Sequence, residues 1–275
     1  MGKTLSILVL AVVLFPTFAA AADGPGTRTP MSPGWGNDFR ERLNEAFVDI
    51  KGASGYATNT NFAYFPQPQK DAEGKFVKNM DGSFKDGEIP PQFRGVGAAA
   101  FAPNIGMNKG NNNAVIMATV ELFSICHDQD ELAFVMAHEM AHLVLNHPKL
   151  VADNNAKVFE AWYDEQSGKD FSFADLDTKT KLARFQKDKG ADLAAFQFPF
   201  EEAADLKGRE IVEQFNRSLG RLKYKAKGSS MMLHAKDFFW VMDLKEAADH
   251  PPIMTRAKKF KEMDLNQSLP SDWNK

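Results

Sequence analysis

The chain has 275 residues, of which 44% are hydrophobic, 25% charged and 11% aromatic, and its formal net charge is −3. This composition is typical of a globular protein and excludes a disordered chain or a bundle of membrane helices. The near balance of 33 basic and 36 acidic residues argues against a nucleic-acid partner, which normally requires a basic excess. The single cysteine, Cys126, excludes a disulfide framework and a cysteine-based metal cage.

The first 22 residues have the pattern of a secretory signal. Lys3 supplies a positive charge, an apolar run extends from Leu5 to Phe15, and Ala20–Ala22 offers the small residues of a cleavage site. An N-terminal membrane anchor is the alternative, but the run is shorter than the roughly 20 residues that span a bilayer. We therefore expect one exported domain over 23–275 without a membrane span. Its expected location is the periplasm, with secretion into the medium as the alternative.

The first half of this domain is predicted to contain one helix and two strands. Residues 23–37 are rich in Gly, Pro, Ser and Thr, which favours an extended segment. An amphipathic helix follows, predicted from apolar residues at helical spacing: Phe39, Leu43, Phe47 and Ile50. Residues 66–94 are polar and punctuated by Gly and Pro, which indicates a β-hairpin excursion. Segments 98–105 and 114–125 have the apolar character of strands.

A helix is predicted next, from about residue 129 to 146. Asp128 is placed as its N-cap and Glu131 follows three residues later, which is the spacing of a capping box. Pro148 is expected to end the helix.

The second half of the chain is predicted to be helical. Residues 164–192 are charged and poor in large aliphatic side chains, which indicates a loop or a solvated helix. Three further helices are expected near 199–219, 230–248 and 252–263. Because strands cluster early and helices late, the predicted fold class is α+β.

The motif His-Glu-Met-Ala-His at residues 138–142 carries the most chemical information. Two histidines four residues apart differ by about 40° around a helix and about 6 Å along it, so both imidazoles can reach one ion. Glu139 points away enough to miss the ion, yet it can hydrogen-bond a metal-bound water. Zinc hydrolases combine two nitrogen ligands and a general base in this way.

Two alternatives to a metal site are a chance match and a pair of core histidines. The second is disfavoured, because apolar residues already supply the buried helix faces and a charged Glu139 between them would be costly to bury. His147 comes five residues after His142 and about 140° around the helix, so it is expected to close the helix rather than to bind the ion.

A catalytic zinc ion needs a third protein ligand. The candidates are acidic residues further along the chain, where Glu201 and Asp205 share one helix face and Glu202 lies about 100° away. The small residues Ala203 and Ala204 would let this helix approach another one closely. The alternative is a solvated acidic start of a helix, where Asp and Glu are common.

Three elements in this order carry a resemblance: HEMAH, Glu-x-x-Ala-Asp at 201–205 and His-Pro-x-x-x-x-Arg at 250–256. Together they resemble the HtpX and CAAX-prenyl-endopeptidase family of zinc metallopeptidases. The stretch DQDELAFVMAHEMAHLVLNH also resembles the active-site helix of that family, and NNNAVIMATVELF resembles its substrate-side strand. The resemblance spans roughly residues 105–260.

This resemblance implies a mostly helical gluzincin fold with a small antiparallel or mixed sheet beside the motif helix, and one Zn²⁺ per chain. It implies that three residues hold the zinc: His138, His142 and Glu201. Glu139 would be the general base, and Asp205 would orient a ligand histidine. His250 and Arg256 would lie near the cleft, as oxyanion stabiliser, substrate contact or removable fourth ligand.

Two functions follow from these residues. The first is an exported zinc endopeptidase that hydrolyses protein or peptide substrates, with Glu139 activating the attacking water. The second is a protein-binding or chaperone-like module with the same fold and a latched site. The complete ligand set favours the first, because a binding module has no need for Glu139. The strand around 113–120 is expected to offer its edge to an extended peptide.

Overall fold

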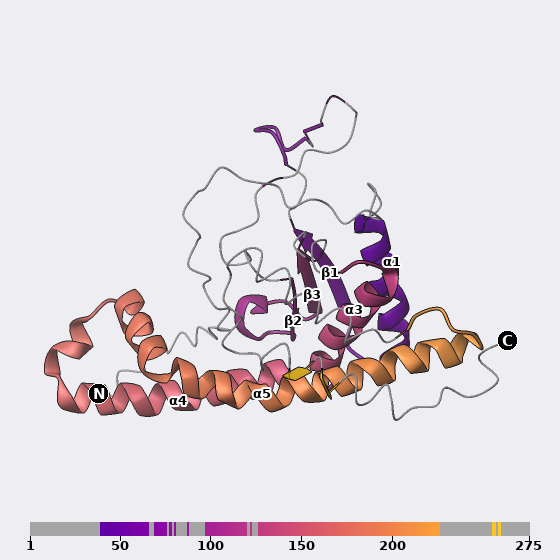
Figure 1. The fold of residues 1–275 in the computed structure, drawn as a ribbon. Coiled ribbons are helices and arrows are strands. Elements are labelled where there is room, and N and C mark those ends of the chain that lie inside the picture. Colours follow the sequence, from indigo (N-terminus) through magenta and orange to yellow (C-terminus); the bar gives the residue numbers. More distant parts are fainter. Residues whose placement is uncertain are drawn as a thin grey trace.

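The computed structural model describes residues 39–65, 69–75, 77–78, 80, 87, 97–119, 122, 126–225, 255–256 and 258–259. Their elements run in the order α1, β1, β2, η2, β3, α3, α4, η3 and α5, where η denotes a short 3-10 helix. Figure 1 shows the strands beside α1 and α3, with the long helix α5 crossing below them. The described part of the chain is mostly helical with one small sheet, which confirms the predicted α+β class.

The sheet has the strand order β1-β3-β2 and mixes two orientations. β1 (Thr60–Phe65) lies parallel to β3 (Ala114–Thr119), and β2 (Ala98–Phe101) lies antiparallel to it. Both predicted strands therefore exist, but both are shorter than predicted. β2 ends before the turn at Asn104, whose φ is 57°, and β3 ends at Thr119, so that Leu122, inside the predicted range 114–125, is helical. β1 was not predicted from the sequence, although its aromatic residues Phe62 and Tyr64, at alternate positions, are typical of a strand.

The prediction that the strand near 113–120 offers a free edge to substrate is wrong. β3 is the central strand, paired along its whole length with β1 and over four residues with β2. Its apolar sequence is therefore that of a central, largely buried strand with a neighbouring strand along each edge.

Helix α3 (Gln129–Val144) carries the HEMAH motif and begins at a variant of the predicted capping box. Asp128 Oδ1 accepts a hydrogen bond from the Glu131 backbone N–H at 3.0 Å. Glu131 Oε2 in turn accepts one from the backbone N–H of His127, one residue before the N-cap, at 2.6 Å. These bonds satisfy backbone donors at the N-terminus and so fix where the helix starts.

The end of α3 differs from the prediction. Asn146 adopts the left-handed conformation, with φ 59° and ψ 26°, and reverses the chain. A second helix, α4 (His147–Lys169), begins at the next residue, with Pro148 in its first turn. The prediction that His147 closes the motif helix is therefore wrong. Proline fits a first helical turn, so Pro148 marks the start of α4.

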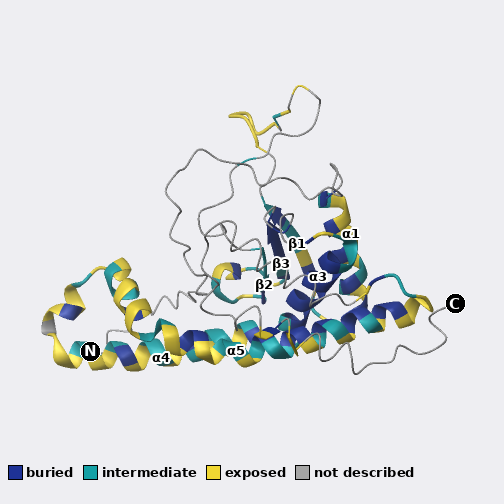
Figure 2. Cartoon of the chain, viewed as in Figure 1, coloured by how far each residue is buried: buried dark blue, intermediate teal, exposed yellow. Residues whose placement is uncertain are grey.

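Helix α3 lies at the centre of the packing, in contact with α1, α5 and β2. Every residue from Glu131 to Ala141 is buried, as the dark blue helix in Figure 2 shows. The predicted N-terminal helix is α1 (Phe39–Ala53), and it buries the predicted apolar face: Phe39, Leu43, Phe47 and Ile50. Because α3 is packed on nearly all sides, the directions of its motif side chains are fixed.

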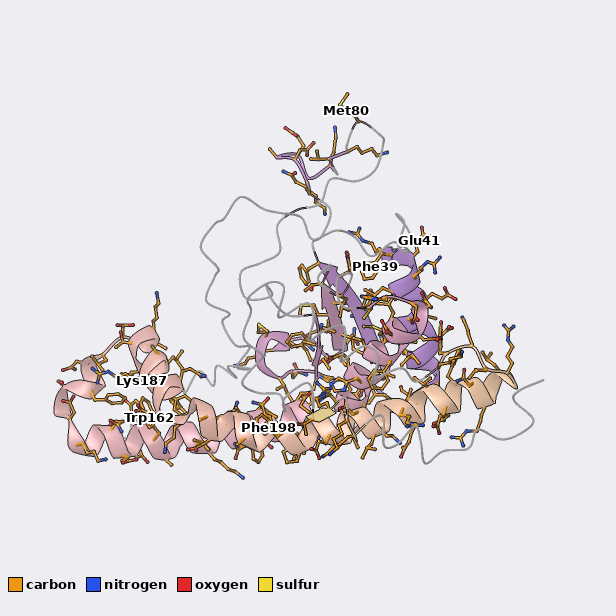
Figure 3. All side chains as sticks on the ribbon, viewed as in Figure 1. Phe39, Glu41, Met80, Trp162, Lys187 and Phe198 are labelled. Atoms are coloured by element: carbon orange, nitrogen blue, oxygen red, sulfur yellow. The ribbon has the colours of Figure 1, made fainter. Side chains whose placement is uncertain are left out.

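Helix α4 and the first part of α5 (Thr178–Leu219) form a helical arm that projects beyond the sheet (Figure 1). Figure 3 shows Trp162 and Lys187 on this arm, far from the strands. Its interior is an aromatic cluster: Trp162, Phe173, Phe185 and Leu193. The segment 164–192 is therefore mainly helical, and the helix expected near 199–219 is the second part of α5, which continues through Pro199.

The signal predicted over 1–22, the extended segment 23–37 and the helix near 230–248 lie outside the described residues. Within 66–94 the structure describes a tight turn closed by backbone hydrogen bonds. Within 252–263 it describes a few helical positions. None of the helices in the described part combines the length and the apolar character that a membrane span requires.

Candidate metal centre

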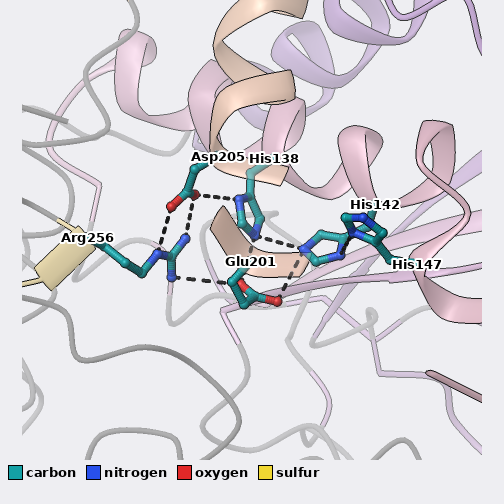
Figure 4. Close-up of polar contacts among 6 residues, drawn as sticks. All are labelled: His138, His142, His147, Glu201, Asp205 and Arg256. Carbon is teal, nitrogen blue, oxygen red and sulfur yellow. Dashed lines mark hydrogen bonds and ion pairs between the residues drawn. The ribbon is translucent and has the colours of Figure 1, made fainter. Parts of the chain in front are cut away.

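Three side chains from two helices meet where α5 crosses α3 (Figure 4). Glu201 Oε2 lies 3.3 Å from His138 Nε2, and Glu201 Oε1 lies 3.4 Å from His142 Nε2. The two Nε2 atoms are 3.0 Å apart. One donor atom from each residue lies within 4.8 Å of the other two. The structure thus brings together the three residues that the resemblance implies as zinc ligands.

The chemistry of this donor set fits a zinc ion. Two imidazole nitrogens and one carboxylate oxygen are ordinary zinc ligands, and three protein ligands leave a position open for water or substrate. The two Nε2 atoms face each other at 3.0 Å. Without a cation, that approach is favourable only when one of them carries a proton, whereas one shared cation satisfies both lone pairs.

The close approach of α5 to α3 depends on small residues of α5. Ala204, one of the two alanines expected to permit it, is fully buried. Gly208 lies against the motif itself: a Cβ at this position would stand 3.0 Å from His138 N and 3.1 Å from His138 Cα. Gly208 was not predicted as a contact residue, although it follows Ala204 by four residues and so shares its helix face.

Asp205, one turn after Glu201 on α5, holds the other side of the His138 ring. Its Oδ1 lies 2.8 Å from His138 Nδ1, the nitrogen that faces away from the donor group. Arg256 donates to the same carboxylate at two points, from Nε to Oδ2 at 2.9 Å and from Nη2 to Oδ1 at 2.6 Å. Arg256 Nη1 also lies 3.9 Å from Glu201 Oε2. All four side chains are buried.

The charges in this cluster depend on one another. Burial alone would raise the pKa of Asp205, but Arg256 and His138 outweigh it and lower the pKa. Burial alone would lower the pKa of Arg256, but the nearby Asp205 carboxylate outweighs the burial and raises that pKa. For His138, the two carboxylates overcome the burial and raise its pKa to about 9. The site therefore favours positive charge between Asp205 and Glu201.

Comparison with known proteins identifies the family. The model for peptidase family M48 matches residues 96–264, which is more than half of the chain and covers both helices of the site. The chain belongs to peptidase family M48. Comparison with curated proteins and with solved structures gives no match. Membership of family M48 makes the chain a metallopeptidase by family, and its predicted ligands coincide with the donor group in the structure.

The structure describes three of the other predicted residues of this M48 chain: Glu139, Glu202 and Arg256. Glu139 is buried on α3, directly after His138. Glu202, an alternative third ligand, is partly exposed to solvent, where its carboxylate pairs with Lys259, and it is not among the metal-donor residues of the described chain. His250 lies outside the described residues. Arg256 contacts the carboxylate of Asp205.

His147, the first residue of α4, contacts the second motif histidine. Its Nδ1 lies 3.1 Å from His142 Nδ1, and its ring stacks on Phe200 with centroids 4.7 Å apart. Burial lowers the pKa of His147 to about 4, so its ring is neutral near pH 7. The spacing of His147 from His142 gave no reason to expect this contact, because it arises from the chain reversal at Asn146.

Proposed function

We propose that this chain is an exported zinc metalloendopeptidase that hydrolyses peptide bonds in protein or peptide substrates, with one zinc ion per chain. The observation that carries the proposal is the largely buried donor group His138, His142 and Glu201, in which two imidazoles and a carboxylate point at one position. Membership of family M48 supports peptide or protein substrates. Export is proposed from the signal pattern of residues 1–22 alone.

The roles proposed for the residues follow from their positions. A zinc ion bound here would polarise the carbonyl of the scissile bond and lower the pKa of the attacking water. Glu139, adjacent to His138, is the proposed base: its carboxylate takes a proton from the attacking water and passes it to the leaving amine. Asp205, held by Arg256, keeps the His138 ring turned so that Nε2 faces Glu201.

The direct test is casein hydrolysis by the purified protein, with its zinc content measured on the same sample. We expect about one zinc per chain, loss of activity with a zinc chelator and recovery when zinc is restored. Glu139→Gln should keep the zinc and the fold but lose nearly all activity, because an amide cannot accept the proton. Zinc binding without casein hydrolysis in the wild type would favour the latched binding module instead.

A matched pair of neighbouring residues tests the third ligand. Glu201→Gln should lose most of the zinc, because two histidines alone bind the ion weakly. Glu202→Gln changes the adjacent side chain, which is exposed and outside the donor group, and should keep both zinc and activity. Equal zinc content in the two variants would mean that another residue supplies the third ligand.

A further inference from the structure

The pair His142 and His147 joins the start of α4 to the zinc-binding face of α3. The two rings meet at 76° with centroids 5.0 Å apart, and their Nδ1 atoms are separated by 3.1 Å, a hydrogen-bond distance. His147 is 5% exposed. Figure 4 shows that this contact lies on the side of the His142 ring opposite the one that faces Glu201.

The chemistry of imidazole assigns the proton in this pair. If His142 binds a metal through Nε2, the lone pair of that nitrogen is used, so the single proton of the neutral ring must be on Nδ1. That Nδ1–H then points at His147 Nδ1, which has to present a lone pair. A neutral His147 with its proton on Nε2 meets this requirement, whereas a protonated ring would set two donors against each other.

The position of His147 is fixed from two sides. The left-handed conformation of Asn146 turns the chain so that His147 faces back toward α3. On its other side the ring stacks on Phe200, at an interplanar angle of 23°, and Phe200 directly precedes the ligand Glu201 on α5. The His147 ring is therefore held between α3 and α5, the two helices that carry the donor group.

We propose that His147 is a positioning residue of the zinc site: its Nδ1 accepts the Nδ1–H of His142 and so fixes the tautomer and orientation in which His142 Nε2 meets the metal. The inference rests on the proposed zinc site. The two ligand histidines are thereby supported differently, since the partner of His138 is the carboxylate of Asp205 and the partner of His142 is a neutral ring. Metal-bound histidines generally need such a partner on their second nitrogen.

Two substitutions at position 147 separate this role from simple packing. His147→Phe keeps an aromatic ring against Phe200 but has no acceptor, whereas His147→Asn gives up the ring but places an amide oxygen near the position of Nδ1. The measurement is the zinc Kd of the metal-free protein, by competition with a chromogenic chelator. We expect the Phe variant to bind zinc about 10–100-fold more weakly and the Asn variant to stay within about threefold of wild type.

The reverse order, with the Phe variant binding normally and the Asn variant weakly, would show that packing alone matters and would overturn the inference. Thermal unfolding of the metal-free variants separates the two effects, because lost packing lowers stability without zinc and lost positioning does not. Zinc binding by the wild type that is no tighter than binding by Glu201→Gln would instead contradict the proposed function, because the proposed site would then not hold the ion.

The wild-type protein offers a test that needs no variant at position 147. With ¹⁵N-labelled histidine and zinc bound, NMR should show His142 protonated at Nδ1, with a scalar coupling across the hydrogen bond to His147 Nδ1. A zinc-loaded protein in which His142 carries its proton on Nε2, or shows no coupling to His147, would overturn the inference.

Discussion

Arg256 and Asp205 form a buried two-point ion pair, with Nε 2.9 Å from Oδ2 and Nη2 2.6 Å from Oδ1. The two side chains are 7% and 6% exposed, so water screens neither charge. Since Asp205 Oδ1 also lies 2.8 Å from His138 Nδ1, the guanidinium fixes the carboxylate that in turn fixes the first motif histidine. Chain segments 51 residues apart are thus joined at the candidate metal centre.

Removing the guanidinium should destabilise the protein even without metal. In Arg256→Ala the carboxylate of Asp205 stays buried without its counter-charge, and we expect a loss of about 3–5 kcal/mol in the free energy of unfolding. Urea unfolding of the metal-free protein measures it. Lys259→Ala is the matched control, because Lys259 belongs to the same short segment but pairs with the exposed Glu202, so its removal should cost about 0–1 kcal/mol. Similar losses in both variants would contradict the role of Arg256 as the counter-charge of the buried Asp205 carboxylate.

Removing the charge of Asp205 should weaken zinc binding through His138. Asp205→Asn keeps the shape of the side chain, but its amide oxygen is a weaker acceptor for His138 Nδ1 than a carboxylate. We expect the zinc Kd to rise about 10–100-fold, as is usual when the partner of a ligand histidine is changed. Chelator competition measures it, and an unchanged Kd would mean that the His138 ring is oriented by packing alone.

The local features of the site could be predicted from the sequence. The capping box at Asp128 and the four-residue spacing of the motif histidines depend only on neighbouring residues, and the structure contains both. Glu201 required more than its spacing, because its helix face was equally compatible with a solvated helix start. The resemblance of the combined motifs to the metallopeptidase family favoured Glu201 over Glu202 as the third ligand.

Other features depend on tertiary packing and could not be read from spacing. The contact between His147 and His142 exists because Asn146 takes a left-handed conformation, whereas the position of Pro148 predicted only the end of a helix. The pairing of β3 on both edges depends on β1, whose short run did not stand out as a strand. In each case a segment distant in the sequence, or the backbone conformation of one residue, decided the outcome.

The contact of Gly208 with His138 predicts that even a methyl group is harmful there. Gly208→Ala would place a Cβ 3.0 Å from His138 N, so α5 must move away from α3 and carry Glu201 with it. We expect a loss of about 1–3 kcal/mol in the free energy of unfolding, together with weaker zinc binding.

The opposite result is expected for Gly168→Ala in α4, where nothing lies within 4 Å and the added methyl favours the helix by up to about 1 kcal/mol. Equal effects would show that Gly208 is not a close-approach position.

A charged cluster remote from the metal centre should make the fold sensitive to alkaline pH. Lys223 Nζ lies 2.8 Å from Glu45 Oε1 and 2.6 Å from Asp49 Oδ2, and the Tyr224 hydroxyl donates to Asp49 Oδ2 at 2.7 Å. The cluster thus joins the segment that follows α5 to α1. Burial, together with the bond to Asp49, raises the pKa of Tyr224 to about 12. Burial lowers the pKa of Lys223, but its carboxylate partners outweigh this and raise it.

Both groups bind their protons more tightly in the folded protein than in the unfolded one. Their contribution to stability is therefore complete below the unfolded pKa values, near 10. The contribution of Tyr224 is lost as the pH rises from about 10 to 12, and that of Lys223 is lost at higher pH. For Tyr224 we expect a loss of about 1–2 kcal/mol, less than the full pKa shift because solvent screens part of the interaction. Urea unfolding at pH 9 and pH 11.5 measures the decline. Tyr224→Phe removes the group that titrates in this range and should flatten the decline. Tyr163→Phe, at a residue that packs against the aromatic cluster of the helical arm, should lose stability as the wild type does. If the Tyr224→Phe protein loses stability as steeply as the wild type, the alkaline sensitivity arises elsewhere in the molecule.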